Sequence, residues 1–173
     1  MGFLFRDKSQ TYAPPPTPPA PTMLGQTPQD PPPSTRGRTA VAVNLPGVPE
    51  TTYLDSEFAP KIDAFIKYAR EAGHELRFTS AYRTPEKQQY MIDHHIGTTP
   101  APNSLHKAGL AVDVDFPKES QSIIRNAAER AGLSWGGAFS DPVHFYFDPI
   151  PGQDRTDLIN NFGEQVRRLQ SRQ

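Results

Sequence analysis

The chain of 173 residues contains no cysteine. This absence excludes disulfide bonds, zinc fingers with thiolate ligands and catalysis by a thiol nucleophile. A metal site in this chain must therefore be built from histidine and carboxylate side chains.

The chain also lacks a large net charge and long apolar runs. The formal net charge is −1 at pH 7, so we expect no electrostatic attraction to nucleic acid. No apolar run approaches the roughly 20 residues that a membrane-spanning helix needs. Residues 1–8 meet charged side chains after three apolar ones, which does not fit a signal peptide. Arg6 stands where a myristoylation signal has Ser or Thr, so we expect neither a secretion signal nor a lipid anchor.

Proline is concentrated at one end of the chain, where residues 1–49 hold 12 of the 20 prolines. Proline removes backbone donors and favours polyproline II, so this segment cannot build a packed core alone. The sequence predicts a Pro-rich arm or linker at residues 1–49 and a folded domain at residues 50–173. Two interpretations of the arm stay open: a semi-rigid tether, or a docking segment anchored on a partner by residues 3–5.

The remaining residues alternate between helical and extended patterns. Helices are predicted at about residues 57–72, 85–94 and 118–131, and from residue 154 onwards. Short strands are predicted at residues 75–80, 110–116 and 143–147, with loops at residues 97–103 and 134–140. Helices mixed with a few short strands indicate an α+β fold, in which a small sheet has helices on its flanks.

Three residues of this pattern are candidate metal ligands. His106 lies in a predicted loop, Asp113 lies seven residues later in the next strand, and His144 lies in the third strand. A catalytic zinc ion takes three protein ligands and keeps an open position for water. An aspartate in an apolar strand is costly unless it is paired or bound to metal. We therefore predict that these side chains converge, with Asp141 as the base that acts on the bound water.

The motifs around these residues resemble a known family. The pattern S-x-H-x-x-G-x-A-x-D at residues 104–113, followed by D-x-x-H at residues 141–144, is similar to the LAS zinc metallopeptidases. That family includes bacterial D-alanyl-D-alanine carboxypeptidases and phage L-alanyl-D-glutamate endopeptidases. Residues 80–84 look like a third signature of the family, with Gln88 five residues after Arg83. The resemblance covers about residues 58–148.

The resemblance implies a fold and a ligand set. The fold would be a small, mainly antiparallel sheet flanked by helices, like that of D-Ala-D-Ala peptidases and Hedgehog domains. His106, Asp113 and His144 would bind Zn²⁺. Residues 50–173 would then be a zinc peptidase domain.

The resemblance also implies roles for residues beside the metal. Asp141 would be the general base and Arg83 would bind substrate. An arginine is always charged and donates in a fork, so Arg83 suits either the reaction's oxyanion or a substrate carboxylate. Gln88 and Ser104 are further candidates for substrate binding.

The substrate implied by the resemblance is the peptide of bacterial peptidoglycan. Many carboxypeptidases of the family have Glu and Trp where Asp141 and Val143 stand here, and an Asp is similar to the phage endopeptidases. We expect a phage virion-associated or lysis enzyme, present in the virion or the host cytoplasm before release and acting in the cell wall or periplasm. Residues 1–49 would bind virion proteins. Two alternatives remain: a non-catalytic wall-binding module, and a structural virion part on the same fold.

Overall fold

The structure is a computed structural model that describes residues 37–97 and 101–172. The chain divides into two units, Met1–Asp30 and Pro31–Gln173, and the second unit holds all the elements described below. The predictions for residues 1–36, including an anchor at residues 3–5, lie outside the described residues. No helix in the described ranges is long and apolar enough to cross a membrane.

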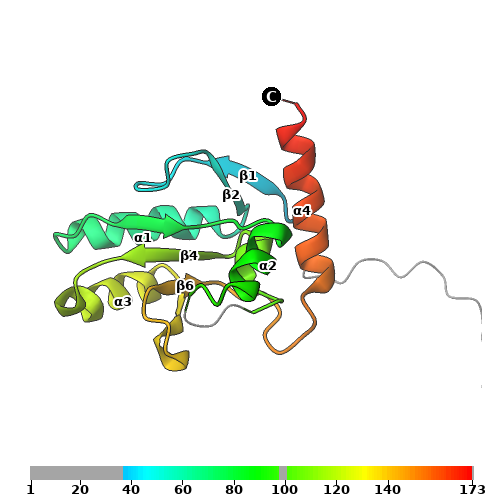
Figure 1. The fold of residues 1–173 in the computed structure, drawn as a ribbon. Coiled ribbons are helices and arrows are strands. Elements are labelled where there is room, and N and C mark those ends of the chain that lie inside the picture. Colours follow the sequence, from blue (N-terminus) through cyan, green and yellow to red (C-terminus); the bar gives the residue numbers. More distant parts are fainter. Residues whose placement is uncertain (1–36, 98–100, 173) are drawn as a thin grey trace, which may run out of the picture. The chain divides into compact units, whose positions relative to one another are not determined.

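A four-stranded antiparallel sheet lies at the centre of the second unit (Figure 1). Its strands are β3 (Arg77–Ser80), β4 (Ala111–Asp115), β6 (His144–Tyr146) and β5 (Ser134–Trp135), in that order across the sheet. The register pairs Asp113 on β4 with His144 on β6 and with Ser80 on β3. The sheet therefore sets two of the predicted metal ligands side by side.

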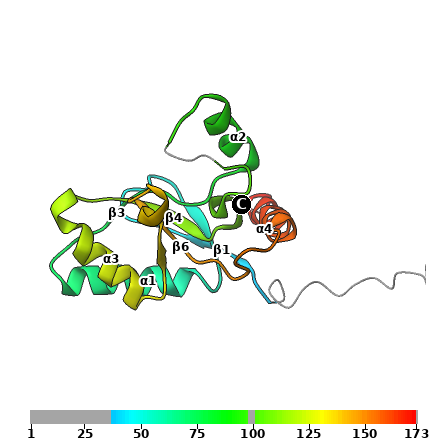
Figure 2. The ribbon, with the colours of Figure 1, turned by 90° about the horizontal axis from the view of Figure 1, so that it is seen from below.

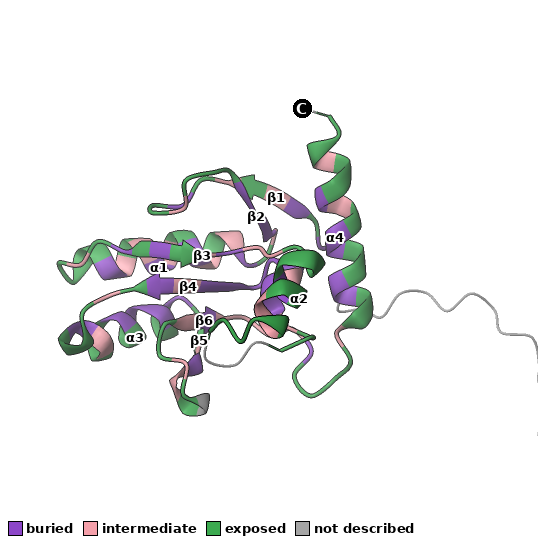
Figure 3. Cartoon of the chain, viewed as in Figure 1, coloured by how far each residue is buried: buried purple, intermediate pink, exposed green. Residues whose placement is uncertain are grey.

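Helices cover the sheet on both sides. The helices α1 (Ala59–Glu71) and α3 (Gln121–Arg130) pack against each other on one face, and α2 (Pro85–Asp93) lies on the other (Figure 2). The buried residues of α1, Ile62, Phe65 and Ala69, recur at helical spacing. Phe65 contacts Phe145 of β6, with 5.1 Å between ring centroids. Burial of β4 is almost continuous along the strand (Figure 3), as expected for the strand at the centre of the core.

The last helix, α4 (Thr156–Gln170), buries one face against the rest of the unit. Its buried apolar residues are Leu158, Ile159, Phe162 and Val166. The helix continues through Gly163, a residue that is poor in helix interiors. Packing of the apolar face outweighs the low propensity of that one position.

The predicted α+β fold with an antiparallel sheet and flanking helices is confirmed. All predicted helices and strands of the second unit are present, with boundaries that shift by a few residues. The segment at residues 134–140 is not a plain loop, because it contains the short strand β5 and the 3₁₀ turn η4 (Gly136–Phe139). Residues 118–120 form a separate 3₁₀ turn, η3 (Lys118–Ser120), before α3.

Part of the segment predicted as a Pro-rich arm, residues 37–49, belongs to the folded unit. Residues 40–43 form the strand β1 (Ala40–Val43), which pairs with β2 (Thr52–Asp55) in a second, two-stranded sheet. Arg38 is buried and binds both oxygens of buried Asp55 at 3.0 and 2.7 Å. The amide of Ala40 donates to Oε1 of Gln165 on α4 at 2.8 Å. The high proline content of residues 1–49 gave no indication of this short strand of alanine and valine. The folded domain begins well before residue 50.

Two N-terminal deletions test where the folded domain begins. A chain that starts at Gly37 should melt at the temperature of the full-length protein. A chain that starts at Val48 should be strongly destabilised, because it lacks β1 and leaves the carboxylate of Asp55 buried without Arg38. Loss of one partner of a buried ion pair costs about 3–5 kcal/mol. Thermal unfolding checks both chains, and equal melting temperatures would show that residues 37–47 are not part of the fold.

Candidate metal centre and substrate cavity

His106 is placed by a short turn that leads into the central strand. The turn is η2 (Leu105–Ala108), and the side chain of Ser104 caps it by accepting from the amide of His106. Gly109 then reverses the chain with φ of +63°, a conformation that glycine adopts without strain. A Cβ at this position would lie 2.2 Å from Cζ of Phe162 on α4. Glycine is therefore required both for the turn and for the close approach of α4.

Three candidate ligand atoms lie close together. They belong to His106 in η2, Asp113 in β4 and His144 in β6. Nε2 of His106 lies 3.2 Å from Nδ1 of His144 and 3.3 Å from Oδ1 of Asp113. Nδ1 of His144 lies 3.1 Å from the same oxygen. Ligands at about 2.0–2.1 Å from a tetrahedral zinc ion are separated by roughly 3.3 Å, so the triangle has the size of one tetrahedron face. The predicted convergence of these three side chains is confirmed.

The protonation pattern of His106 suits a metal ligand. Nδ1 of His106 donates to the carbonyl of Ala81 at 2.6 Å, which fixes the ring and leaves Nε2 as the coordinating nitrogen. The side chain is buried, and burial lowers the pKa of His106, so the ring stays neutral. A neutral imidazole whose lone pair faces a carboxylate oxygen is well placed to bind a cation.

Asp113 is an ionised carboxylate with two separate tasks. Burial opposes its ionisation, but the polar contacts with the rings of His106 and His144 and the charge of Arg83 outweigh burial and hold the pKa of Asp113 well below its usual value. Oδ1 faces the two histidines, and Oδ2 accepts from Nη2 of Arg83. One oxygen is thus directed at the metal position while the other is held in place by an arginine.

Arg83 is fixed against the metal ligands at several points. Its Nε donates to Oγ of Ser80 at 2.8 Å, and its amide donates to the carbonyl of His106 at 3.1 Å. The structure thus places Arg83 beside Asp113, where it orients a ligand, and also in the wall of the cavity. The sequence had indicated only contact with substrate or oxyanion.

A cation fits the three converging atoms. Each offers a lone pair toward one point, and the proton of a neutral His106 is already committed to Ala81. A single positive ion can satisfy all three atoms at once, and two imidazoles with one carboxylate form a donor set typical of zinc.

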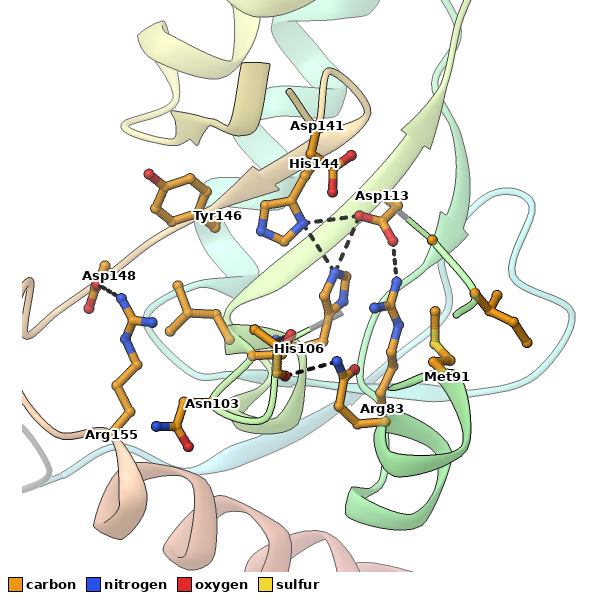
Figure 4. A pocket seen from close by; sticks show the side chains of 16 residues that line it. Arg83, Met91, Asn103, His106, Asp113, Asp141, His144, Tyr146, Asp148 and Arg155 are labelled. Carbon is orange, nitrogen blue, oxygen red and sulfur yellow. Dashed lines mark hydrogen bonds and ion pairs between the residues drawn. The ribbon is translucent and has the colours of Figure 1, made fainter. Parts of the chain in front are cut away.

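The three ligands line a cavity of about 450 Å³. Arg83 and Met91 lie on one side of His106, and Asp148 and Arg155 lie on the other (Figure 4). A cavity of this volume lies within the range of small-ligand sites and can hold a short peptide segment.

Asp141 lies in the cavity wall beside His144 (Figure 4). Its backbone carbonyl accepts from the amide of His144 at 3.2 Å, which ties the two residues together. Burial raises the pKa of Asp141, and Asp113 adds to the effect, although the neighbouring cationic groups oppose it. A half-buried carboxylate with a raised pKa is a stronger proton acceptor than an exposed aspartate.

The other two predicted substrate-binding residues, Gln88 and Ser104, line the cavity as Arg83 does. Gln88 is buried on α2 and donates from Nε2 to the carbonyl of Ala101 at 3.0 Å. Its Oε1 is buried and has no hydrogen-bond partner within the described part of the chain. That oxygen can accept a hydrogen bond from a peptide N–H in the cavity.

The cavity wall also includes Tyr146, Asp148 and Arg155. Tyr146 lies two residues after His144 on the same strand, so the period-two rule for strands could have placed it on the face of the site. Its ring stacks on that of His144 with 5.4 Å between centroids. No local pattern marks Arg155, which comes to the cavity from the loop before α4.

No protein-family model and no curated protein sequence matches the chain. Among solved structures, it is similar to the Serratia marcescens L-Ala D-Glu endopeptidase ChiX at 20% identity and a TM-score of 0.45, over 55% of this chain and 80% of that one. It is also similar to a variant of the vancomycin resistance D,D-pentapeptidase VanY from a VanB-type cassette, in complex with Zn(II), at 21% identity and a TM-score of 0.46, over 68% and 84%. A third similar structure is VanYB in complex with D-Ala-D-Ala, at 21% identity and a TM-score of 0.47. That similarity covers 73% of this chain and 88% of that one.

Proposed function

We propose that this protein hydrolyses peptide bonds in the stem peptides of peptidoglycan, using a zinc ion held by His106, Asp113 and His144. The observation that carries the proposal is the triangle of ligand atoms in the wall of a peptide-sized cavity, with Asp141 beside it. The motifs shared with LAS metallopeptidases support the choice of substrate.

The residues around the ligands divide the chemistry between them. A zinc ion bound here would lower the pKa of a coordinated water toward roughly 7 and polarise the peptide carbonyl. Asp141 takes the proton from the attacking water and passes it to the leaving amine, because its raised pKa suits both transfers. Arg83 holds the Asp113 carboxylate in position and places positive charge near the carbonyl oxygen.

Gln88 and Ser104 would hold the peptide backbone. Oε1 of Gln88 is a buried acceptor that a peptide N–H would satisfy. The hydroxyl of Ser104 accepts from the amide of His106 and can still donate its own hydrogen to a substrate carbonyl. Both residues lie on the cavity wall and keep the scissile bond near the ligands.

The finer assignment is an endopeptidase that cleaves next to D-glutamate, in a phage virion or lysis system. An aspartate at position 141, where many carboxypeptidases have glutamate, supports the endopeptidase type. The Pro-rich composition of residues 1–36 supports attachment to a larger assembly, such as virion proteins.

A zymogram on purified cell walls tests the proposal against the alternative of a binding module on the same fold. The zinc-loaded protein should clear the wall substrate, and Asp141→Asn should leave it intact while still binding to it. A binding module needs no base, so equal behaviour of the two proteins without clearing would favour the alternative.

A further inference from the structure

An arginine–aspartate pair lies at the end of the cavity away from Arg83 (Figure 4). Asp148 follows β6, and Arg155 immediately precedes α4. Nη2 of Arg155 donates to Oδ2 of Asp148. The pair lies after the last motif that resembles the peptidase family, residues 141–144.

The carboxylate of Asp148 is already occupied by the protein. Its Oδ1 accepts from the amide of Ile150 at 3.1 Å, and its Oδ2 accepts from Arg155. The side chain is only 11% exposed. Asp148 therefore positions the guanidinium group and has little capacity left for a ligand.

Arg155, in contrast, has a donor to spare. Its Nε is buried without a hydrogen-bond partner within the described residues, although the side chain as a whole is 28% exposed. A guanidinium group carries five N–H donors in a fixed plane, and the bond to Asp148 uses one of them. A buried donor without an acceptor is costly, and a carboxylate matches the geometry of the guanidinium group.

The backbone around Arg155 is held in place. Its carbonyl accepts from the amide of Ile159 in the first turn of α4, at 2.9 Å. Phe162 packs α4 onto Gly109, directly after the turn that carries His106. The loop from Asp148 contains Pro149 and Pro151, whose rings restrict the backbone, and Ile150 is buried between them. Arg155 is thus fixed with respect to the metal ligands.

We propose that Arg155 binds a carboxylate of the substrate on the side of the scissile bond away from Arg83, with Asp148 as its positioning residue. This inference rests on the proposed function and narrows its substrate class to acidic peptides. In a stem peptide the acceptor would be the free carboxylate of D-glutamate, and amidation of that group would remove it.

Two soluble stem peptides, one with the D-glutamate carboxylate free and one with it amidated, provide the test on the zinc-loaded full-length protein. The wild type should show a lower KM for the acidic peptide. Arg155→Gln should raise that KM by about 10- to 100-fold, the usual effect of losing a charged hydrogen bond, and should change the KM of the amidated peptide much less. Arg155→Lys should recover part of the loss, because it restores the charge without the fork.

A variant of Asp148, the partner of Arg155, distinguishes loss of the binding site from loss of folding. Asp148→Asn keeps the charge of Arg155 and loosens its position, so it should raise the KM of the acidic peptide alone, by less than Arg155→Gln does. Melting temperature and zinc content should match the wild type in every variant used. An equal rise in KM for both peptides, or no rise for either, would overturn the inference.

Calorimetric binding separates this inference from the proposed function. Arg155-dependent binding of the acidic peptide without cleavage of either peptide would support the binding site and refute the peptidase. Cleavage of both peptides with affinities that do not depend on Arg155 would refute the binding site alone.

Discussion

Asp141→Asn is expected to lower kcat by about 10²- to 10⁴-fold on a soluble stem peptide, the usual contribution of a general base. The substitution keeps the size of the side chain and removes its ability to take a proton. Asp141 is not one of the three converging ligands, so zinc content and melting temperature should stay at wild-type values.

Asp115, which lies two residues after Asp113 on β4, provides the control for this variant. Asp115→Asn alters an exposed residue of the same strand as Asp113 and should leave kcat unchanged. Near-normal turnover of Asp141→Asn would remove Asp141 from the mechanism. A parallel loss of zinc would instead make it a ligand or a structural residue.

His106→Ala should abolish both stable zinc binding and hydrolysis. The ring supplies one of three ligand atoms, and its loss leaves two ligands and a hole in a buried wall. A catalytic zinc site normally requires three protein ligands. Metal analysis after dialysis should show about one zinc ion per chain for the wild type and a small fraction of that for the variant.

His94→Ala is the matched control, because His94 is an exposed histidine at the end of α2 and does not line the cavity. It should keep zinc and activity. Full retention of zinc by His106→Ala, with the protein folded, would contradict the ligand assignment.

The sequence was sufficient to predict that the three candidate metal ligands lie together, because they belong to short motifs. His106 lies in the turn η2, and Asp113 lies in the strand β4 that follows it. Asp141 precedes His144 by three residues. In each case local structure fixes most of the geometry, and only the pairing of β4 with β6 had to be assumed.

Features that depend on distant contacts were not predictable in the same way. Arg38 lies in the segment predicted as a Pro-rich arm or linker, and nothing local indicates its buried ion pair with Asp55. Arg155 lies seven residues from Asp148 in a proline-containing loop, and nothing local shows that this loop returns to the cavity. Composition and periodicity describe neighbours along the chain, whereas these two arginines are placed by tertiary packing.

Mass spectrometry of a muropeptide digest tests the central claim most directly. Purified muropeptides are incubated with the zinc-loaded protein, with the protein after chelation, and with the chelated protein after zinc is restored. We expect peptide-bond hydrolysis products in the first sample, their absence in the second and their return in the third, because the proposed mechanism needs a zinc ion bound by His106, Asp113 and His144. Unchanged muropeptides in the presence of a folded protein that carries about one zinc ion per chain would contradict the account.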